Sequence, residues 1–86
     1  MKTDFSEEYK TIGLNIAYYR KLRGFTQMQL AEKINISRTH LSNIEAPGVH
    51  TSVSLEVLFQ IADVLEIPVD RLLVMPLADF HPQKIV

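Results

Sequence analysis

Apolar residues recur every three or four positions along most of the 86-residue chain. This spacing gathers them on one face of an α-helix, which turns about 100° per residue, and no segment shows the strict alternation of a half-buried strand. The sequence therefore predicts an all-α fold of five helices around one core. The residues expected to face that core are Tyr9, Ile12, Ile16, Tyr19, Leu30, Ala31, Ile34, Leu41, Ile44, Leu55, Leu58, Ile61, Ala62, Leu65, Leu72 and Leu73.

Residues that favour helix ends divide this pattern into segments. Serine and threonine side chains accept hydrogen bonds from the free N–H groups at the start of a helix. Gln29 completes a capping box with the threonine three residues before it, and Gly24 suits the left-handed position after the first helix, which is expected to end at about Arg23. Pro68 opens a short fifth helix. The predicted N-caps of the first four helices are Ser6, Thr26, Ser37 and Ser54.

The length of the chain limits its domain organisation. It allows one core and is too short for a binding domain with a separate sensor domain, so we expect one domain over residues 6–75, an extension at 1–5 and a tail at 76–86. The chain has no Cys, which excludes disulfides and thiolate metal sites. It has no run of 18 apolar residues and no secretory signal, so we expect a cytoplasmic protein without membrane contact.

Enzyme and cofactor motifs are absent from the sequence. There is no phosphate-binding glycine loop, no HExxH and no GxSxG. The three histidines, His40, His50 and His81, lack the spacing of metal ligands. We therefore expect no enzymatic activity, no metal, no cofactor and no small-molecule ligand.

The net charge of −1 is unevenly distributed. Residues 9–43 hold six basic residues and one acidic residue, a balance of +5, whereas residues 44–86 hold two basic and six acidic residues, a balance of −4. The first eight residues contribute −2. The positive charge therefore lies in the middle of the chain, as an element that contacts nucleic acid would require.

Residues 26–45 form two short predicted helices joined by a turn at Asn35-Ile36, the arrangement of a helix-turn-helix unit. In the second helix, 38–45, Leu41 and Ile44 mark the buried side. At about 100° per residue, the remaining positions form a short polar face that suits the major groove of duplex DNA. The residues on this outward side and its flanks are Arg38, Thr39, His40, Ser42 and Asn43.

The pattern extends beyond this unit, from about Ile12 to Leu73. Its matching positions are Ile16, Arg20, Thr26-Gln27, Leu30-Ala31, Ser37-Arg38, Ile44-Glu45, Ser54-Leu55, Leu58, Ile61-Ala62, Leu65 and Leu72. In these positions the chain resembles the lambda-repressor-like (Cro/C1, or XRE) helix-turn-helix family. The resemblance implies a five-helix DNA-binding domain of a transcriptional regulator, a repressor or autoregulator, that binds double-stranded DNA as a homodimer.

The resemblance also implies a role for individual residues. Arg38, Thr39 and Asn43 are expected to read bases, since arginine pairs with guanine and asparagine with adenine in the major groove. Arg20 and Glu45 are expected to form a buried ion pair that ties the first helix to the end of the third. The expected phosphate contacts are Gln27, Ser37, His40, Ser42 and Thr51.

The chain departs from the family in the loop after Glu45. Ala46-Pro47 precedes Gly48, which stands one place late, and Val53 replaces the proline that usually opens the fourth helix. Thr51 keeps a hydroxyl group suited to a phosphate in this loop.

Two apolar features leave alternatives open. Leu14, Ala17 and Tyr18, with Leu22, form either a patch for a partner or dimer contact, or a surface covered by the N-terminal segment near Phe5. The apolar residues of the tail either fold back on the core or join a dimer; they are Leu77, Phe80, Ile85 and Val86.

The alternative function is a protein-interaction module without a DNA role, whose binding would lack the steep salt dependence of DNA contacts.

Overall fold

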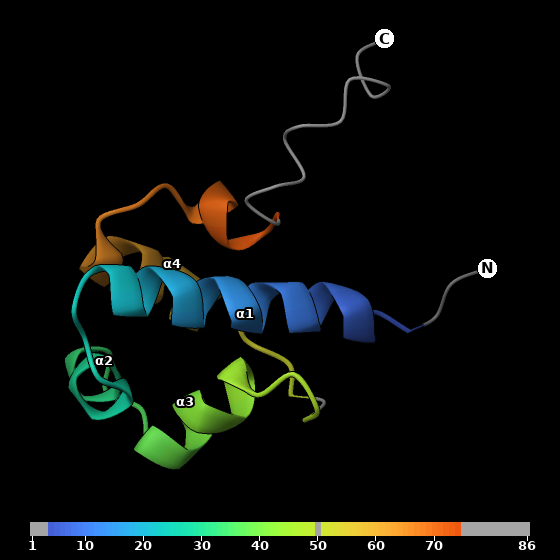
Figure 1. Ribbon diagram of the computed structural model, residues 1–86, viewed down its shortest axis with the longest axis horizontal. Coiled ribbons are helices and arrows are strands. Elements are labelled where there is room, and N and C mark those ends of the chain that lie inside the picture. Colours follow the sequence, from blue (N-terminus) through green and yellow to red (C-terminus); the bar gives the residue numbers. More distant parts are fainter. Residues whose placement is uncertain (1–3, 50, 75–86) are drawn as a thin grey trace, which may run out of the picture.

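The computed structural model describes residues 4–49 and 51–74, which form four α-helices and one 3-10 helix with no strand among them (Figure 1). The elements are α1 (Ser6–Leu22), α2 (Gln27–Lys33), α3 (Arg38–Glu45), α4 (Leu55–Leu65) and the 3-10 helix η1 (Val69–Leu72). No helix in this part of the chain is long and apolar enough to cross a membrane. The all-α prediction is confirmed. The tail with its apolar residues, most of the extension, His50 and His81 lie outside the described residues.

The fifth helix differs from the prediction in type. It is a single 3-10 turn, in which the N–H groups of Arg71 and Leu73 donate to the carbonyls of Pro68 and Asp70, both at an N···O distance of 3.0 Å. A helix of four residues is too short to build an α-helical ladder, and bonds to the third residue before are typical of such short pieces.

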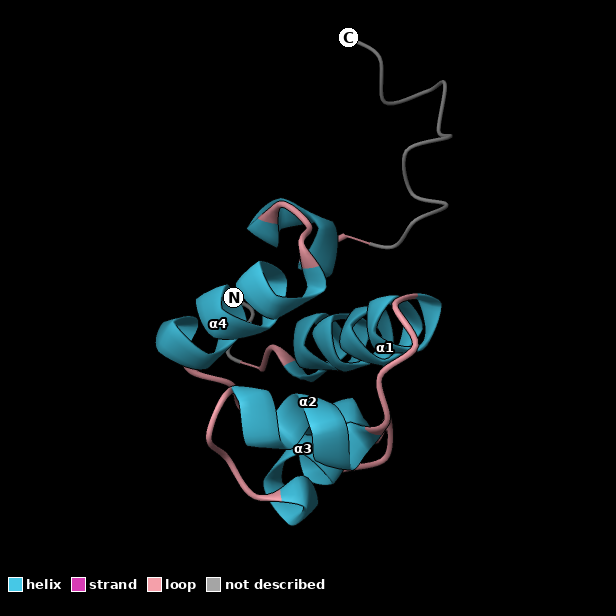
Figure 2. Cartoon of the chain, turned by 90° about the vertical axis from the view of Figure 1, so that its left-hand side faces the viewer, coloured by secondary structure: helices cyan, strands magenta, loops and turns pink. Residues whose placement is uncertain are grey.

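Helix α1 crosses the middle of the molecule (Figure 1). Helices α2 and α3 lie on one side of it, η1 lies on the opposite side, and α4 packs behind it (Figures 1 and 2). The side of α1 that faces away from α4 is covered by none of the other helices (Figure 2). All five elements contribute to the buried apolar core, which consists of Ile16, Tyr19, Leu30, Ala31, Ile34, Leu41, Ile44, Leu58, Ile61, Ala62, Leu65 and Leu72.

The core prediction was wrong at two positions. Leu55 is 69% exposed; it is the first residue of α4 and lies one turn before Leu58, the first residue of that helix to be buried. Leu73 is 48% exposed because it follows the end of η1, whose Leu72 already fills the core. Tyr9 and Ile12, also expected in the core, are half-buried.

Most of the predicted helix ends are confirmed. The hydroxyls of Thr26, Ser37 and Ser54 accept the N–H three residues on at 3.0, 2.9 and 3.1 Å. Gln29 returns a bond to the N–H of Thr26 and completes the capping box. Gly24 adopts a φ of 81° after α1. These ends depend on residues close in sequence, which is why the sequence alone reveals them.

The start of α1 differs from the prediction. Phe5, not Ser6, is the N-cap residue, and its side chain makes no capping hydrogen bond. The carboxylate of Asp4 accepts the N–H of Ser6 at 2.8 Å instead. A carboxylate at this position also favours the positive end of the helix dipole, and it leaves the Ser6 hydroxyl without the capping role.

Two buried residues of α1 carry tertiary contacts that the sequence analysis missed. Gly13 lies where α1 crosses α3, and a Cβ atom there would overlap the carbonyl oxygen of Ile44. Asn15 is 1% exposed, and its amide donates to the carbonyls of Leu72 and Val74 at 3.2 and 2.7 Å. The first contact lets α1 and α3 approach, and the second fixes the end of η1 on α1.

Candidate nucleic-acid interface

The turn between α2 and α3 has the geometry that its asparagine predicted. Asn35 adopts a left-handed φ of 61°, a conformation that short polar side chains tolerate better than most. The N–H groups of Asn35 and Ile36 donate to the carbonyls of Glu32 and Ala31 at 3.3 and 3.0 Å. These bonds satisfy the last carbonyls of α2, so the chain leaves that helix sharply and α3 begins three residues later.

Helix α3 is divided into a buried and an exposed side. Leu41 and Ile44 are 0% and 4% exposed and hold the helix on the core. Ser42 is half-buried, and Ser37 at the N-cap is exposed. Since the Ser37 oxygen accepts the N–H of His40, its O–H remains a donor for another group. The exposed residues within α3 are Arg38, Thr39, His40 and Asn43.

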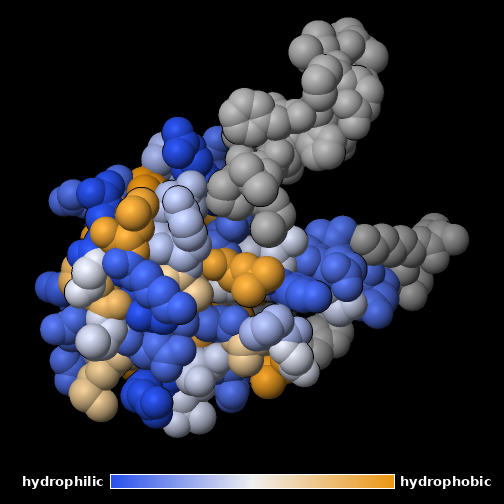
Figure 3. Space-filling view, in the orientation of Figure 1, coloured by the Kyte–Doolittle hydropathy of each residue, from blue (hydrophilic) through white to orange (hydrophobic). Residues whose placement is uncertain are grey.

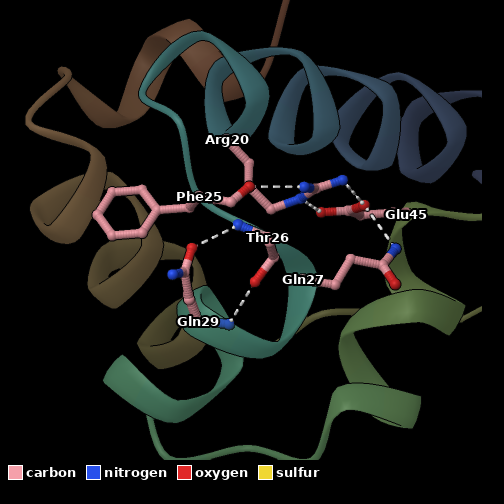
Figure 4. A network of polar contacts seen from close by, with 6 residues as sticks. All are labelled: Arg20, Phe25, Thr26, Gln27, Gln29 and Glu45. Atoms are coloured by element: carbon pink, nitrogen blue, oxygen red, sulfur yellow. Dashed lines mark hydrogen bonds and ion pairs between the residues drawn. The ribbon is translucent and has the colours of Figure 1, made fainter.

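The expected ion pair is present beneath this surface (Figure 4). The Arg20 guanidinium donates to both carboxylate oxygens of Glu45, at 2.7 and 2.9 Å, and to the carbonyl of Phe25 at 2.8 Å. The two side chains are only 8% and 5% exposed. This network ties α1, the start of the α2 segment and the end of α3 into one rigid unit.

Gln27 joins this network (Figure 4). Its Nε2 donates to Glu45 Oε1 at 2.9 Å, a bond the sequence analysis did not predict. The carboxylate can accept only from the nitrogen, so it fixes which way the amide faces, and the second N–H of that nitrogen is not used by this bond. The half-buried Gln27 therefore stands beside the C-terminal end of α3, apart from Ser37 and Arg38 at the N-terminal end.

The remaining expected phosphate contact lies in the loop between α3 and α4. Thr51 is half-buried, and its N–H donates to the carbonyl of Val49 at 3.1 Å. The expected contacts thus come from three places along the chain: the start of α2, the whole of α3, and this loop.

Arg23 is a second basic residue of the positively charged middle segment, after Arg20, that has a structural role. The Arg23 guanidinium donates to the carbonyls of Leu65 and Glu66 at 2.7 and 3.1 Å, where α4 ends. It therefore ties the end of α1 to the end of α4 and neutralises the negative end of that helix dipole. This contact joins residues more than 40 positions apart, and no local signal in the sequence points to it.

The interface consists of hydrogen-bond donors and acceptors. In residues 4–49 and 51–74, no group of three or more His, Asp or Glu side chains is placed to hold a metal ion. The chemistry that the exposed side of α3 offers is polar recognition by an arginine, an asparagine, a histidine and hydroxyl groups.

A helix-turn-helix family model matches residues 16–72. The chain belongs to the Cro/C1-type (XRE) helix-turn-helix family. The match covers two thirds of the chain, from the middle of α1 to the end of η1, and contains α2, the turn and α3 in full. The predicted family and fold are confirmed.

Members of this family with known roles are similar over the same region. The chain is 37% identical over 62 residues to the HTH-type transcriptional regulator SinR of Bacillus subtilis, a match that covers 72% of this chain and 55% of SinR. It is 48% identical over 44 residues to the immunity repressor protein of Bacillus phage phi105, which covers 51% of this chain and 31% of that repressor. The aligned region thus spans about half or less of these relatives.

A solved structure of SinR in complex with DNA is also similar. It superposes with a TM-score of 0.67 at 36% identity, and the match covers 73% of this chain and 98% of that SinR chain. Nearly the whole of the SinR chain in that complex therefore has a counterpart here.

Proposed function

We propose that this protein binds double-stranded DNA in a sequence-specific manner and regulates transcription, with α3 in the major groove. The division of α3 carries the proposal: Leu41 and Ile44 anchor it, and Arg38 and Asn43 stand exposed on its other side. An α-helix fits the major groove, where each base pair presents a distinct pattern of donors and acceptors. The similarity to SinR, solved in complex with DNA, supports the same use of the fold.

Individual contacts follow from the chemistry of each side chain. Arg38, Thr39 and Asn43 would read base edges, and each good bidentate pair discriminates by about 1–3 kcal/mol. The second N–H of Gln27 would donate to a phosphate, because Glu45 already holds the amide in place. Hydroxyl and imidazole groups would supply the other phosphate contacts; these are Ser37, His40, Ser42 and Thr51.

The proposed active form is a homodimer on a pseudo-palindromic site. One α3 reaches only a few base pairs, and a second copy doubles both the base contacts and the phosphate contacts. The two recognition helices would lie about 34 Å apart, one turn of the duplex. The proposal places the protein in the cytoplasm, as expected for a regulator similar to SinR of Bacillus subtilis, and requires no metal, cofactor or small-molecule ligand.

Selection of bound sequences from a randomised duplex pool tests this function. Wild-type protein should enrich a two-fold motif, and Arg38→Ala should blur it at defined positions. Arg71→Ala is the matched control, because Arg71 is exposed on η1, on the far side of α1 from α3. Its motif should equal that of the wild type.

A second outcome would favour the protein-interaction alternative. If the wild type enriches no motif and Arg38→Ala changes nothing, α3 does not read DNA. Binding through several phosphates weakens steeply with salt, whereas an apolar protein contact does not. Weak, salt-insensitive retention of duplex DNA would therefore reject the proposed function.

A further inference from the structure

One face of α1 leaves apolar side chains exposed. With the chain described from Asp4 onward, Leu14 is 37% exposed and Tyr18 is 51% exposed, beside a half-buried Ala17. Of the two alternatives for this patch, the described N-terminal segment therefore does not supply a cover. Arg23, which donates to carbonyls at the end of α4, is nine residues from Leu14 and therefore on the opposite side of the helix, so this face looks away from α4. Figure 3, in the orientation of Figure 1, shows apolar residues among polar ones on the front of the molecule.

The same face carries charges in a symmetric order. Glu7, Leu14 and Lys21 follow each other at intervals of seven residues, which is nearly two full helical turns. They therefore line up along α1, with Glu7 and Lys21 exposed at the two ends and Leu14 midway. At about 1.5 Å per residue, the ends stand about 21 Å apart.

We propose that a second copy of this chain packs on this face, with the two α1 helices antiparallel and Leu14 on the two-fold axis. Glu7 and Lys21 are each seven residues from Leu14, so the antiparallel arrangement places Glu7 opposite the partner's Lys21, and Lys21 opposite the partner's Glu7. Tyr18 lies opposite the partner's Lys10, whose stem and charge both suit an aromatic ring. The inference rests on the homodimer of the proposed function and assigns its interface.

This symmetry is compatible with DNA binding. The two-fold axis lies in the contact plane and is perpendicular to both α1 helices. Because α2 and α3 lie on one side of α1 and the contact face is its front, the rotation leaves both α3 helices on the same side of the dimer (Figures 1 and 2). Both can then face one duplex. An isologous contact of this kind closes on itself and leaves no patch for further copies.

The pattern favours a second copy over any other occupant. Glu7 at one end, Leu14 at the centre and Lys21 at the other end form a surface that is complementary to itself in the antiparallel direction, in which Lys10 meets an aromatic ring and not a second charge. The contact is small: a helix pair about 21 Å long and about 10 Å wide buries on the order of 400 Å² in total. Stable complexes bury about 1,200 Å² or more, so the free protein is expected to be monomeric. Two adjacent half-sites raise the effective concentration and bring the copies together.

Charge reversal tests this register. Glu7→Lys and Lys21→Glu should each reduce cooperative binding to a duplex with two half-sites by about tenfold, because each variant puts like charges at both ends of the contact. The double variant should recover cooperativity. An equal mixture of the two single variants should also recover it, because each then meets the opposite charge. An effect on folding alone cannot explain recovery by mixing.

Controls separate the interface from the DNA site. Affinity for a single half-site should remain unchanged in both variants, and Glu56→Lys, at an exposed position of α4, should keep full cooperativity. If the charge-reversed variants bind the half-site like the wild type and also keep full cooperativity on two half-sites, the proposed interface is wrong and the proposed function stands. Failure of the wild type on the half-site would reject the proposed function itself.

A cross-link provides a second measurement. Because the chain has no Cys, Leu14→Cys introduces a single thiol. On a two-half-site duplex, a short bis-maleimide should join two copies through this residue, whereas Phe59→Cys, exposed on α4, should not react in this way. The double variant Leu14→Cys/Phe80→Cys tests the alternative. If it cross-links within one chain and Leu14→Cys alone joins no copies, the tail covers the face and the proposed dimer contact is wrong.

Discussion

At the scale of single residues, the packing of α1 on α3 depends on a glycine, which has no Cβ atom. Gly13 is buried at the crossing, and a Cβ atom there would overlap the carbonyl oxygen of Ile44. A backbone atom cannot rotate away as a side chain can, so the two helices would have to separate. The position of α3, and of the residues proposed to contact DNA, therefore depends on this glycine.

Gly13→Ala should lower the free energy of unfolding by about 1–3 kcal/mol or more, as overpacking of a tight core does. Alanine is the better helix former by about 1 kcal/mol, so a loss would have to exceed that gain. Gly48→Ala is the matched control, because nothing lies within 4 Å of its Cβ position. Urea unfolding of both variants measures the difference; equal stability would contradict the close approach.

The buried ion pair leads to a second prediction at this scale. Glu45→Gln leaves the Arg20 guanidinium charged in a site where its side chain is 8% exposed. Removal of one partner from such a pair costs about 3–5 kcal/mol, whereas replacement of both by apolar residues costs much less. Arg20→Met/Glu45→Leu should therefore unfold at a higher urea concentration than Glu45→Gln. Glu32→Gln, exposed on α2, should have no effect.

At the scale of elements, α3 is capped by Ser37, a residue that is assigned two roles. Ser37 caps the helix through its bond to the N–H of His40, and its hydroxyl is also proposed to donate to a phosphate. Aspartate caps helices as well as serine does, but it repels a phosphate. Substitution of Ser37 by alanine and by aspartate therefore separates the effect on folding from the effect on DNA binding.

Ser37→Ala should lower the free energy of unfolding by about 1 kcal/mol, the usual cost of a lost N-cap. Ser37→Asp should keep the stability of the wild type and weaken binding to the selected duplex. Thermal unfolding and a binding titration measure the two effects. If Ser37→Asp binds as tightly as the wild type, Ser37 lies away from the phosphates.

The sequence predicts the helix ends and the turn, which have local signals, and does not predict the long-range contacts, which have none. Thr26, Ser37 and Asn35 act on backbone groups within a few residues, so helix ends and the turn could be read directly. Asn15 and Arg23 contact carbonyls more than 40 residues away, and the sequence around them carries no trace of that partner. The exposed side of α3 could be predicted because the spacing of Leu41 and Ile44 identifies the buried side. The bond from Gln27 to Glu45 could not, because it depends on how α2 and α3 pack.

At the scale of the whole molecule, the acidic residues that give the chain its negative net charge do not gather on α2 and α3. Helices α2 and α3 carry two basic and two acidic residues, of which Glu45 is buried in the pair with Arg20, whereas α4 carries two acidic residues and no basic residue. A net charge of −1 is therefore compatible with a DNA-binding side. The negative charge of α4 would discourage the duplex from docking on that helix.

The salt dependence of binding then measures how many copies contact DNA. Each neutralised phosphate contributes about −0.9 to the slope of log K against log salt. If two copies bind in the same way, the slope on a duplex with two half-sites should be about twice the slope on one half-site, since the second copy brings an equal number of basic side chains to the duplex. Titrations at several salt concentrations on both duplexes give the two slopes. Equal slopes would mean that only one copy touches the DNA, and the homodimer would have to be abandoned even if the sequence motif were two-fold.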